Sequence, residues 1–171
     1  MLFNIFVSLF LFQVANVNAA PASEKAQKWL KPILTYSIFN SPKTLSFNDT
    51  KESFRYAFNQ WSPIAQKRFE EIPWNETNAS DIKIIFNDFN GASVGHALSD
   101  GEIWIIDQRI FKKYIPGERI DPQKKDITLI AMVHIQSILI WNNVINGNDY
   151  SVTQNFNGIY ILPTVIKRNQ L

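Results

Sequence analysis

The sequence predicts an α+β fold in which a twisted mixed sheet packs against a first long helix and a second, buried central helix. Two kinds of periodicity support this expectation. Short segments rich in β-branched and aromatic residues, at 33–38 and 81–87, are typical of strands. Apolar residues spaced by three and four positions between 54 and 61 indicate an amphipathic helix, and the almost wholly apolar stretch at 127–141 indicates a buried one.

The first half of the chain is expected to hold one strand followed by the amphipathic helix. The strand is 33–38 (Ile-Leu-Thr-Tyr-Ser-Ile). We expect the helix to begin at Asp49, because Glu52 follows three residues later, which is the spacing of a capping box. Pro63 is expected to end it, since proline disrupts the helix interior. Its apolar stripe consists of Phe54, Ala57, Phe58 and Trp61.

Three more strands are expected in the middle of the chain. The first is 81–87 (Asp-Ile-Lys-Ile-Ile-Phe-Asn), and a turn-prone stretch at 87–91 closes it. Two shorter strands, 92–98 and 102–107, flank the Ser-Asp-Gly turn at 99–101.

The apolar stretch at 127–141 is the strongest helix signal in the sequence. Asp126 is its expected N-cap, after a polar, proline-containing segment at 117–125. Because nearly every position is apolar, we expect this helix to be the central buried helix of the domain. A turn-rich exit at 142–147 follows, and 159–166 is either a short strand or a frayed tail.

The N-terminus predicts secretion. An apolar run at 5–12 precedes Val17 and Ala19, whose small side chains fit a signal peptidase site after residue 19. The alternative is an ordinary N-terminal core element. We therefore expect a signal peptide at 1–19 and a single extracellular domain at 20–171.

Three N-x-S/T sequons are candidate glycosylation sites in a secreted chain. Their asparagines are Asn48, Asn75 and Asn78.

Charge and cysteine content exclude several classes of protein. The net charge is only +2 and the basic residues are scattered, so nucleic acid is not an expected partner. There is no cysteine, which excludes a disulfide framework. The stretch at 127–141 is shorter than the ~20 apolar residues that a membrane span needs, so no span is expected.

Several blocks of the sequence occur in an order that points to one family. They are Lys-Trp-Leu-Lys at 28–31 with Leu-Thr-Tyr at 34–36, Ala-Phe-Asn-Gln-Trp-Ser at 57–62, Ala-Ser-Asp-Ile-Lys-Ile at 79–84, Gly-His-Ala-Leu at 95–98 with Gly-Glu-Ile-Trp-Ile-Ile-Asp at 101–107, and Leu-Ile-Ala-Met-Val-His at 129–134. Together they resemble the catalytic domain of the matrixins, the matrix metalloproteinase family. The resemblance implies a three-layer, metzincin-like fold whose central helix is the active-site helix. Compared with that family, the chain is expected to have a truncated C-terminal subdomain and to lack a propeptide and a hemopexin-like domain.

The family's active-site motif, H-E-x-x-H-x-x-G-x-x-H, is mostly lost. In that motif three histidines hold zinc, and the glutamate is the general base that deprotonates the zinc-bound water. His134 keeps the first position, but Ile135 replaces the glutamate, Ile138 and Val144 replace the other histidines, and Trp141 replaces the glycine. The methionine turn departs too, with Thr153 where the methionine would lie.

Too few ligands remain for a catalytic zinc site, which needs about three. By resemblance, His134 is the remnant of the catalytic zinc site and His96 that of the structural zinc site, where Trp104 replaces another ligand. We interpret His134 as a buried, neutral, hydrogen-bonded histidine. No cofactor is expected, although zinc serves the ancestral family. Calcium binding and plain surface charge are alternative interpretations of four carboxylates, Asp88, Asp100, Glu102 and Asp107.

These losses predict a secreted, non-catalytic relative of a protease that binds extended peptides or inhibitors in the remnant cleft. By resemblance, its peptide-binding edge strand consists of Ala92, Ser93, Val94, Gly95, His96, Ala97 and Leu98. Expected partners are proteins or peptides, including protease inhibitors and matrix proteins, and the chain is expected to be a monomer.

Three other interpretations stay open. The first is a working zinc-dependent extracellular metalloendopeptidase, the family-level function. The second is a structural glycoprotein of an extracellular matrix, and the third is a decaying duplicate with no selected role.

Overall fold

The structure is a computed structural model that describes residues 29–74, 79–89, 93–115, 117–145, 150–154 and 161–165. Its centre is a five-stranded sheet with the strand order β2-β1-β3-β5-β4. The sheet strands are β1 (Ile33–Ile38), β2 (Arg68–Glu71), β3 (Ile82–Asn87), β4 (Gly95–Ala97) and β5 (Glu102–Ile106). Four of them run parallel, and β4 pairs antiparallel with β5.

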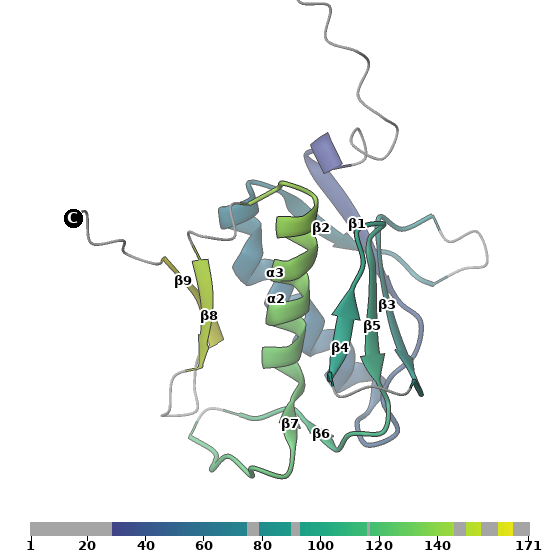
Figure 1. Ribbon diagram of the computed structural model, residues 1–171, viewed down its shortest axis with the longest axis vertical. Helices are drawn as coiled ribbons and strands as arrows, with labels where there is room; N and C mark the ends of the chain where they lie inside the picture. The colour runs from purple at the N-terminus through teal and green to yellow at the C-terminus, as the bar shows by residue number, and fades with distance from the viewer. Residues whose placement is uncertain are drawn as a thin grey trace, which may run out of the picture.

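Two helices, α2 (Phe47–Ala65) and α3 (Ile127–Trp141), lie on one side of this sheet (Figure 1). Short strands β6 (Phe111–Lys112) and β7 (Lys125–Asp126) pair just before α3. The hairpin formed by β8 (Tyr150–Gln154) and β9 (Ile161–Val165) lies across α3 from the sheet. The predicted α+β fold, with a mixed sheet and two helices, is therefore confirmed.

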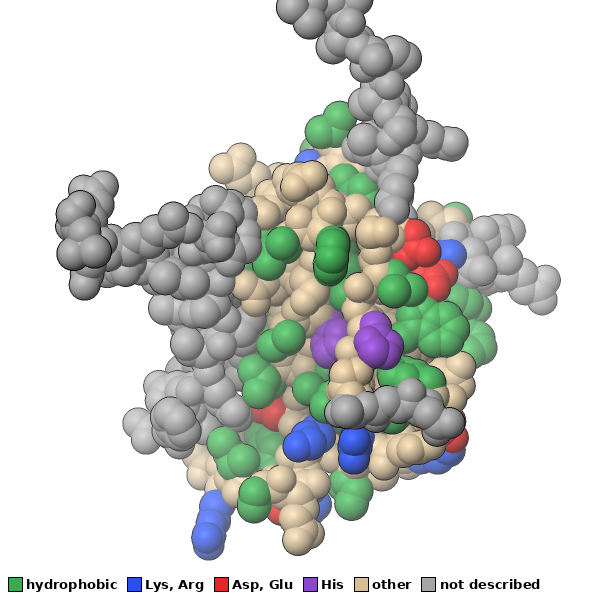
Figure 2. Space-filling model, in the orientation of Figure 1, with side chains coloured by type: hydrophobic (Ala, Val, Ile, Leu, Met, Phe, Trp, Pro, Cys, Tyr) green, Lys and Arg blue, Asp and Glu red, His purple; other side chains and the backbone are tan. Residues whose placement is uncertain are grey.

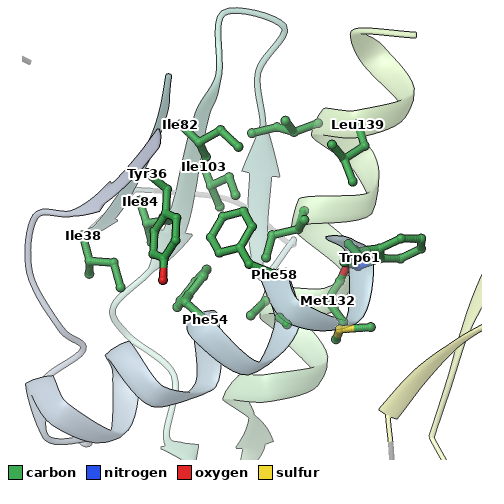
Figure 3. Close-up of a cluster of buried hydrophobic side chains, with 14 of the residues drawn as sticks. Tyr36, Ile38, Phe54, Phe58, Trp61, Ile82, Ile84, Ile103, Met132 and Leu139 are labelled. Atoms are coloured by element: carbon green, nitrogen blue, oxygen red, sulfur yellow. The ribbon is translucent and has the colours of Figure 1, made fainter. Parts of the chain in front are cut away.

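The core lies between the sheet and the two helices (Figure 3). The Phe58 ring of α2 stacks on Tyr36 of β1, with 4.1 Å between ring centroids. Trp61 of α2 donates its indole N–H to the Met132 carbonyl of α3 at 3.0 Å, in a fully buried position. The other labelled members of the cluster are Ile38, Phe54, Ile82, Ile84, Ile103 and Leu139.

Both ends of α2 differ from the sequence prediction. The N-cap is Ser46, not Asp49, because the Ser46 hydroxyl accepts the Asp49 N–H at 3.1 Å and returns a bond to the Asp49 carboxylate at 2.6 Å. The acidic residue is thus the third residue of the helix and not its cap. Pro63 does not end the helix, which continues to Ala65 and closes at Gln66 in the left-handed conformation (φ 52°).

The prediction for α3 was more accurate. The helix runs from Ile127 to Trp141, and Asp126 caps it by accepting the N–H groups of Thr128 and Leu129. The helix is buried along much of its surface, as expected, but Val133 and Trp141 are exposed along one side.

Several strands also differ from the prediction. Strand β2 was missed because three of its four residues, Arg68, Glu70 and Glu71, are charged. The expected strand at 92–98 forms a ladder only over Gly95–Ala97, and Ala92 lies outside the described residues. Of the two alternatives for 159–166, the strand is confirmed at Ile161–Val165.

The Trp61 contact generates a stability prediction. Replacing Trp61 by Phe keeps an aromatic ring but removes the N–H that reaches Met132, so we expect a loss of about 1–3 kcal/mol in the free energy of unfolding. Urea unfolding followed by circular dichroism measures this change. The matched control is Trp141→Phe, which should change stability by less than about 0.5 kcal/mol because Trp141 is 65% exposed.

Candidate functional site

The free edge of the sheet at β4 is the first component of the site. β4 forms the end of the strand order and pairs only with β5 in the described part of the chain. The Val94 carbonyl accepts the Ile106 N–H, and Leu98 donates to Glu102, so even-numbered residues direct their backbone groups toward β5. Gly95 and Ala97 therefore direct their N–H and C=O groups outward, to the free edge.

The two edges of the sheet differ in charge. At the opposite edge, β2 carries Arg68 and Glu70, both exposed. Exposed charges are a common means of protecting a sheet edge against added strands. The described residues of the β4 edge, 93–98, include no Asp, Glu, Lys or Arg. Only the β4 edge is therefore electrostatically open to an additional strand.

His134 of α3 lies against this edge from the helix side. The ring is 8% exposed, and its Nδ1 lies 2.8 Å from the Ile130 carbonyl oxygen. A second hydrogen bond joins the ring to the backbone of Gly95 and favours the protonated ring. A bond that favours the protonated ring has the Gly95 carbonyl as its acceptor, and a neutral ring can donate to only one of its two carbonyl partners at a time.

Close packing accompanies this bond. A Cβ added to Gly95 would lie 2.6 Å from His134 Nε2 and 2.7 Å from the Trp104 carbonyl oxygen. Glycine is therefore required here for close approach of the strand to the imidazole. Burial is the largest influence on the ring and lowers the pKa of His134 below its ordinary value of 6.5, since the buried site disfavours the charged form.

The residues around His134 do not fit a zinc ion. Ile135 and Ile138, which follow His134 by one and four positions on α3, are fully buried in the core. Among the described residues, the hydrogen-bonding contacts of the imidazole are with backbone groups, and His96 acts on it only electrostatically. Among the described residues, no three His, Cys, Asp or Glu side chains are grouped so that they could hold a metal ion.

His96 lies on the other face of β4. Its ring stacks on Phe89 with 4.9 Å between centroids, and its Nδ1 is 3.5 Å from the Ser93 hydroxyl. Trp104, its partner in the β4–β5 register, donates to the Glu102 carboxylate at 2.9 Å. The two imidazoles are visible side by side at this edge (Figure 2). They approach β4 from opposite faces, because His96 alternates with Gly95 along the strand.

The four candidate calcium carboxylates form two separate groups. Asp88 and Asp107, at the ends of β3 and β5, both pair with Lys43, whose Nζ lies 3.1 and 3.2 Å from them. At the other end of β5, Glu102 pairs with Lys83, and Asp100 accepts the Glu102 backbone N–H. A lysine ammonium thus already lies where Asp88 and Asp107 converge.

Apolar side chains are exposed on α3 and at the end of β4. Val133 and Trp141 belong to α3, and Leu98 follows β4, with exposures of 40%, 65% and 43%. Sequence analysis missed these exposed residues because α3 was expected to be the central buried helix. The polar Ser137, which lies between Val133 and Trp141 and is also partly exposed, was one available signal.

The described residues include one predicted glycosylation site. Asn48 is exposed in the first turn of α2, whereas the Thr50 hydroxyl of the same sequon is buried and donates to the Ser46 carbonyl at 2.9 Å. Asn75, Asn78 and the expected signal peptide at 1–19 lie outside the described residues. Neither described helix combines the length and the apolar character that a bilayer span requires.

A mixed sheet with an open antiparallel edge strand, a central helix beside that edge and a histidine between them define a metzincin-like domain. The chain belongs to the matrixin family, whose model matches residues 28–125, more than half of its length. That match ends just before α3, the helix that carries His134.

Known matrixins resemble parts of this chain. Human matrix metalloproteinase-19 is 35% identical over 60 residues, which is 35% of this chain and 11% of that protein. Human matrix metalloproteinase-16 is 36% identical over 72 residues, or 39% of this chain and 12% of the relative. Rat macrophage metalloelastase is 31% identical over 98 residues, or 52% of this chain and 20% of the relative. The chain therefore spans only about a tenth to a fifth of these relatives.

The contact between Gly95 and His134 predicts a coupled effect on stability. Gly95→Ala should destabilise the fold by about 1–3 kcal/mol, because the new methyl group meets His134 Nε2 and the Trp104 carbonyl. In the background His134→Ala, the penalty should be smaller but not zero, since the Trp104 carbonyl remains. Urea unfolding of the four proteins of this double-mutant cycle measures the coupling, and strictly additive penalties would contradict the contact.

The lowered pKa of His134 predicts a pH dependence of stability. The unfolded chain binds this proton more readily than the folded one, so the contribution of the neutral ring is complete above about pH 6.5. It is lost as the pH falls toward the lower pKa of the folded state, with a slope of at most about 1.4 kcal/mol per pH unit. Urea unfolding between pH 7.5 and 5.0 should show this slope, and His134→Leu should reduce it. Parallel curves for the two proteins would count against the assignment.

Proposed function

We propose that this chain is a secreted, non-catalytic matrixin domain that binds extended peptides along the free edge of β4. The observation that carries the proposal is the state of His134. Its imidazole is hydrogen-bonded to the backbone of Ile130 and Gly95, and the buried Ile135 follows it where the family has a glutamate.

The chemistry of peptide hydrolysis in this family needs groups that this site does not offer. Zinc requires about three protein ligands, and its bound water requires a carboxylate base. Ile135 can serve neither role, and a fully buried isoleucine at 138 cannot replace a ligand. The apolar side chains instead fill the volume beside α3, which favours a packed core without a metal.

Peptide binding requires none of these catalytic groups. A strand added to a sheet edge is held by main-chain hydrogen bonds, and side-chain contacts supply specificity. β4 offers outward backbone groups at an edge without charged side chains, and it is followed by the exposed Leu98. Peptides, protease inhibitors and matrix proteins with an extended apolar segment are the partners that suit such a surface.

The proposed extracellular location rests on the sequence. The apolar run at 5–12 and the small residues before position 20 support a signal peptide, and Asn48 is exposed as a glycan acceptor. Mass spectrometry of the secreted protein before and after glycosidase treatment tests the cleavage of the signal peptide and the glycosylation of Asn48. A chain that begins at residue 20 and carries glycan on Asn48 supports the proposed location.

A working metalloendopeptidase is the second candidate, because the relatives include proteins named as metalloproteinases and a metalloelastase. The two candidates differ in metal dependence. We expect the purified protein to retain much less than one zinc per chain after dialysis, and EDTA to leave its melting temperature unchanged. Elemental analysis and calorimetry measure these quantities, and one tightly bound zinc per chain would refute the non-catalytic assignment.

Peptide binding through the edge is tested at Ala97. Ala97→Pro removes an outward N–H without removing a bond to β5, so it should weaken binding of a capped collagen-like octapeptide by roughly tenfold or more. Ala97→Val adds comparable bulk but keeps the N–H and should bind nearly as the wild type does. Isothermal titration calorimetry compares the three proteins. Equal affinities for the proline and valine variants would exclude strand addition at this edge.

A further inference from the structure

The outward backbone groups of β4 are not equally available. Gly95 and Ala97 both direct their N–H and C=O groups to the free edge, as the alternation of hydrogen bonds with β5 requires. The Gly95 carbonyl, however, lies in contact with the His134 ring, whose single N–H in the neutral form it shares with the Ile130 carbonyl. The free edge therefore combines one partly occupied position with one open position two residues further along.

From this arrangement, and resting on the proposed peptide-binding function, we infer that His134 sets the register of an added strand. Because the imidazole contacts the outward carbonyl of Gly95, an extended peptide forms its main-chain hydrogen bonds with Ala97 instead. His134 is thus a positioning residue of the binding site, and it acts through β4 without being a metal ligand.

The packing around Gly95 supports this inference independently of the hydrogen bond. The imidazole lies so close beneath the strand that even a methyl group on Gly95 would be 2.6 Å from Nε2. A peptide paired at Gly95 would have to share the carbonyl with the ring. It would also have to place its own side chain on the α3 side, next to the imidazole.

At Ala97 the corresponding space is different. Ala97 carries only a methyl group on the α3 side and is partly exposed. Trp141 is exposed at the C-terminal end of α3, whereas Leu98 alternates with Ala97 and is exposed on the face of β4 away from α3. The site should therefore accept an extended peptide that forms its few main-chain hydrogen bonds with Ala97.

Two variants separate the hydrogen bond from simple packing. His134→Leu fills much of the same volume in the helix without a donor, and His134→Gln keeps a donor of similar reach. In the protein without peptide, the carbonyl carbon resonance of Gly95 should move upfield in the leucine variant and be partly restored by glutamine. The Ala97 carbonyl resonance should not move. An unchanged Gly95 resonance in His134→Leu would overturn the inference even if the variant is well folded.

Peptide titrations provide the second part of the test. With a capped collagen-like octapeptide, calorimetry should give a roughly two- to tenfold higher affinity for His134→Leu than for the wild type, because Gly95 becomes available. Ala97→Pro should weaken binding strongly in the wild type and less in the His134→Leu background. Equal losses in both backgrounds would overturn the register assignment.

The same experiments distinguish failure of the inference from failure of the proposed function. If no variant binds the octapeptide while the Gly95 resonance still responds to His134, the peptide-binding function is refuted and the register assignment with it. If the wild type binds and His134→Leu changes neither the affinity nor the resonance, peptide binding stands and the role of His134 is refuted.

Discussion

The position of the His134 imidazole between the Ile130 and Gly95 carbonyls is the contact on which the interpretation of the site depends. This contact joins α3 to β4. Both sides of the ring, where a metal ion would have to bind, are thereby in contact with backbone groups. A neutral imidazole has one N–H, so it can donate to only one of the two carbonyls at a time. The burial that keeps the ring neutral thus also limits how firmly it holds β4.

Much of the architecture could be predicted from local patterns in the sequence. The Asp126 cap and the apolar stretch after it gave α3 with correct ends, and the β-branched segments gave β1 and β3. Strand β2 could not be found in this way, because an edge strand exposed on one side needs no apolar run and its pairing with β1 is set by tertiary structure. Likewise, the capping role of Ser46 depended on a backbone conformation that the acidic spacing alone did not specify.

The candidate site was predicted less completely than the fold. Sequence comparison of motif positions correctly placed His134 on a buried helix beside the expected edge strand. It could not show that Gly95 would lie against Nε2, because that contact joins two elements about forty positions apart. That His96 and His134 lie on opposite faces of β4 also depends on this contact, because His96 alternates with Gly95 along the strand.

The residues that follow His134 on α3 belong to the core. Ile135 and Ile138 are fully buried together with Met132 and Leu139. Under the proposed non-catalytic function, folding would therefore not depend on metal binding, although the two are linked in proteins with structural metal sites.

The unequal edges of the sheet have a consequence for self-association. Uncontrolled growth of fibrils requires two adhesive edges on each molecule, so that every added copy presents a new one. In this domain Arg68 and Glu70 make the β2 edge unfavourable for pairing with another strand, whereas the β4 edge allows such pairing. Any pairing through β4 would consequently terminate after a single event, and a crowded solution would accumulate pairs and not filaments.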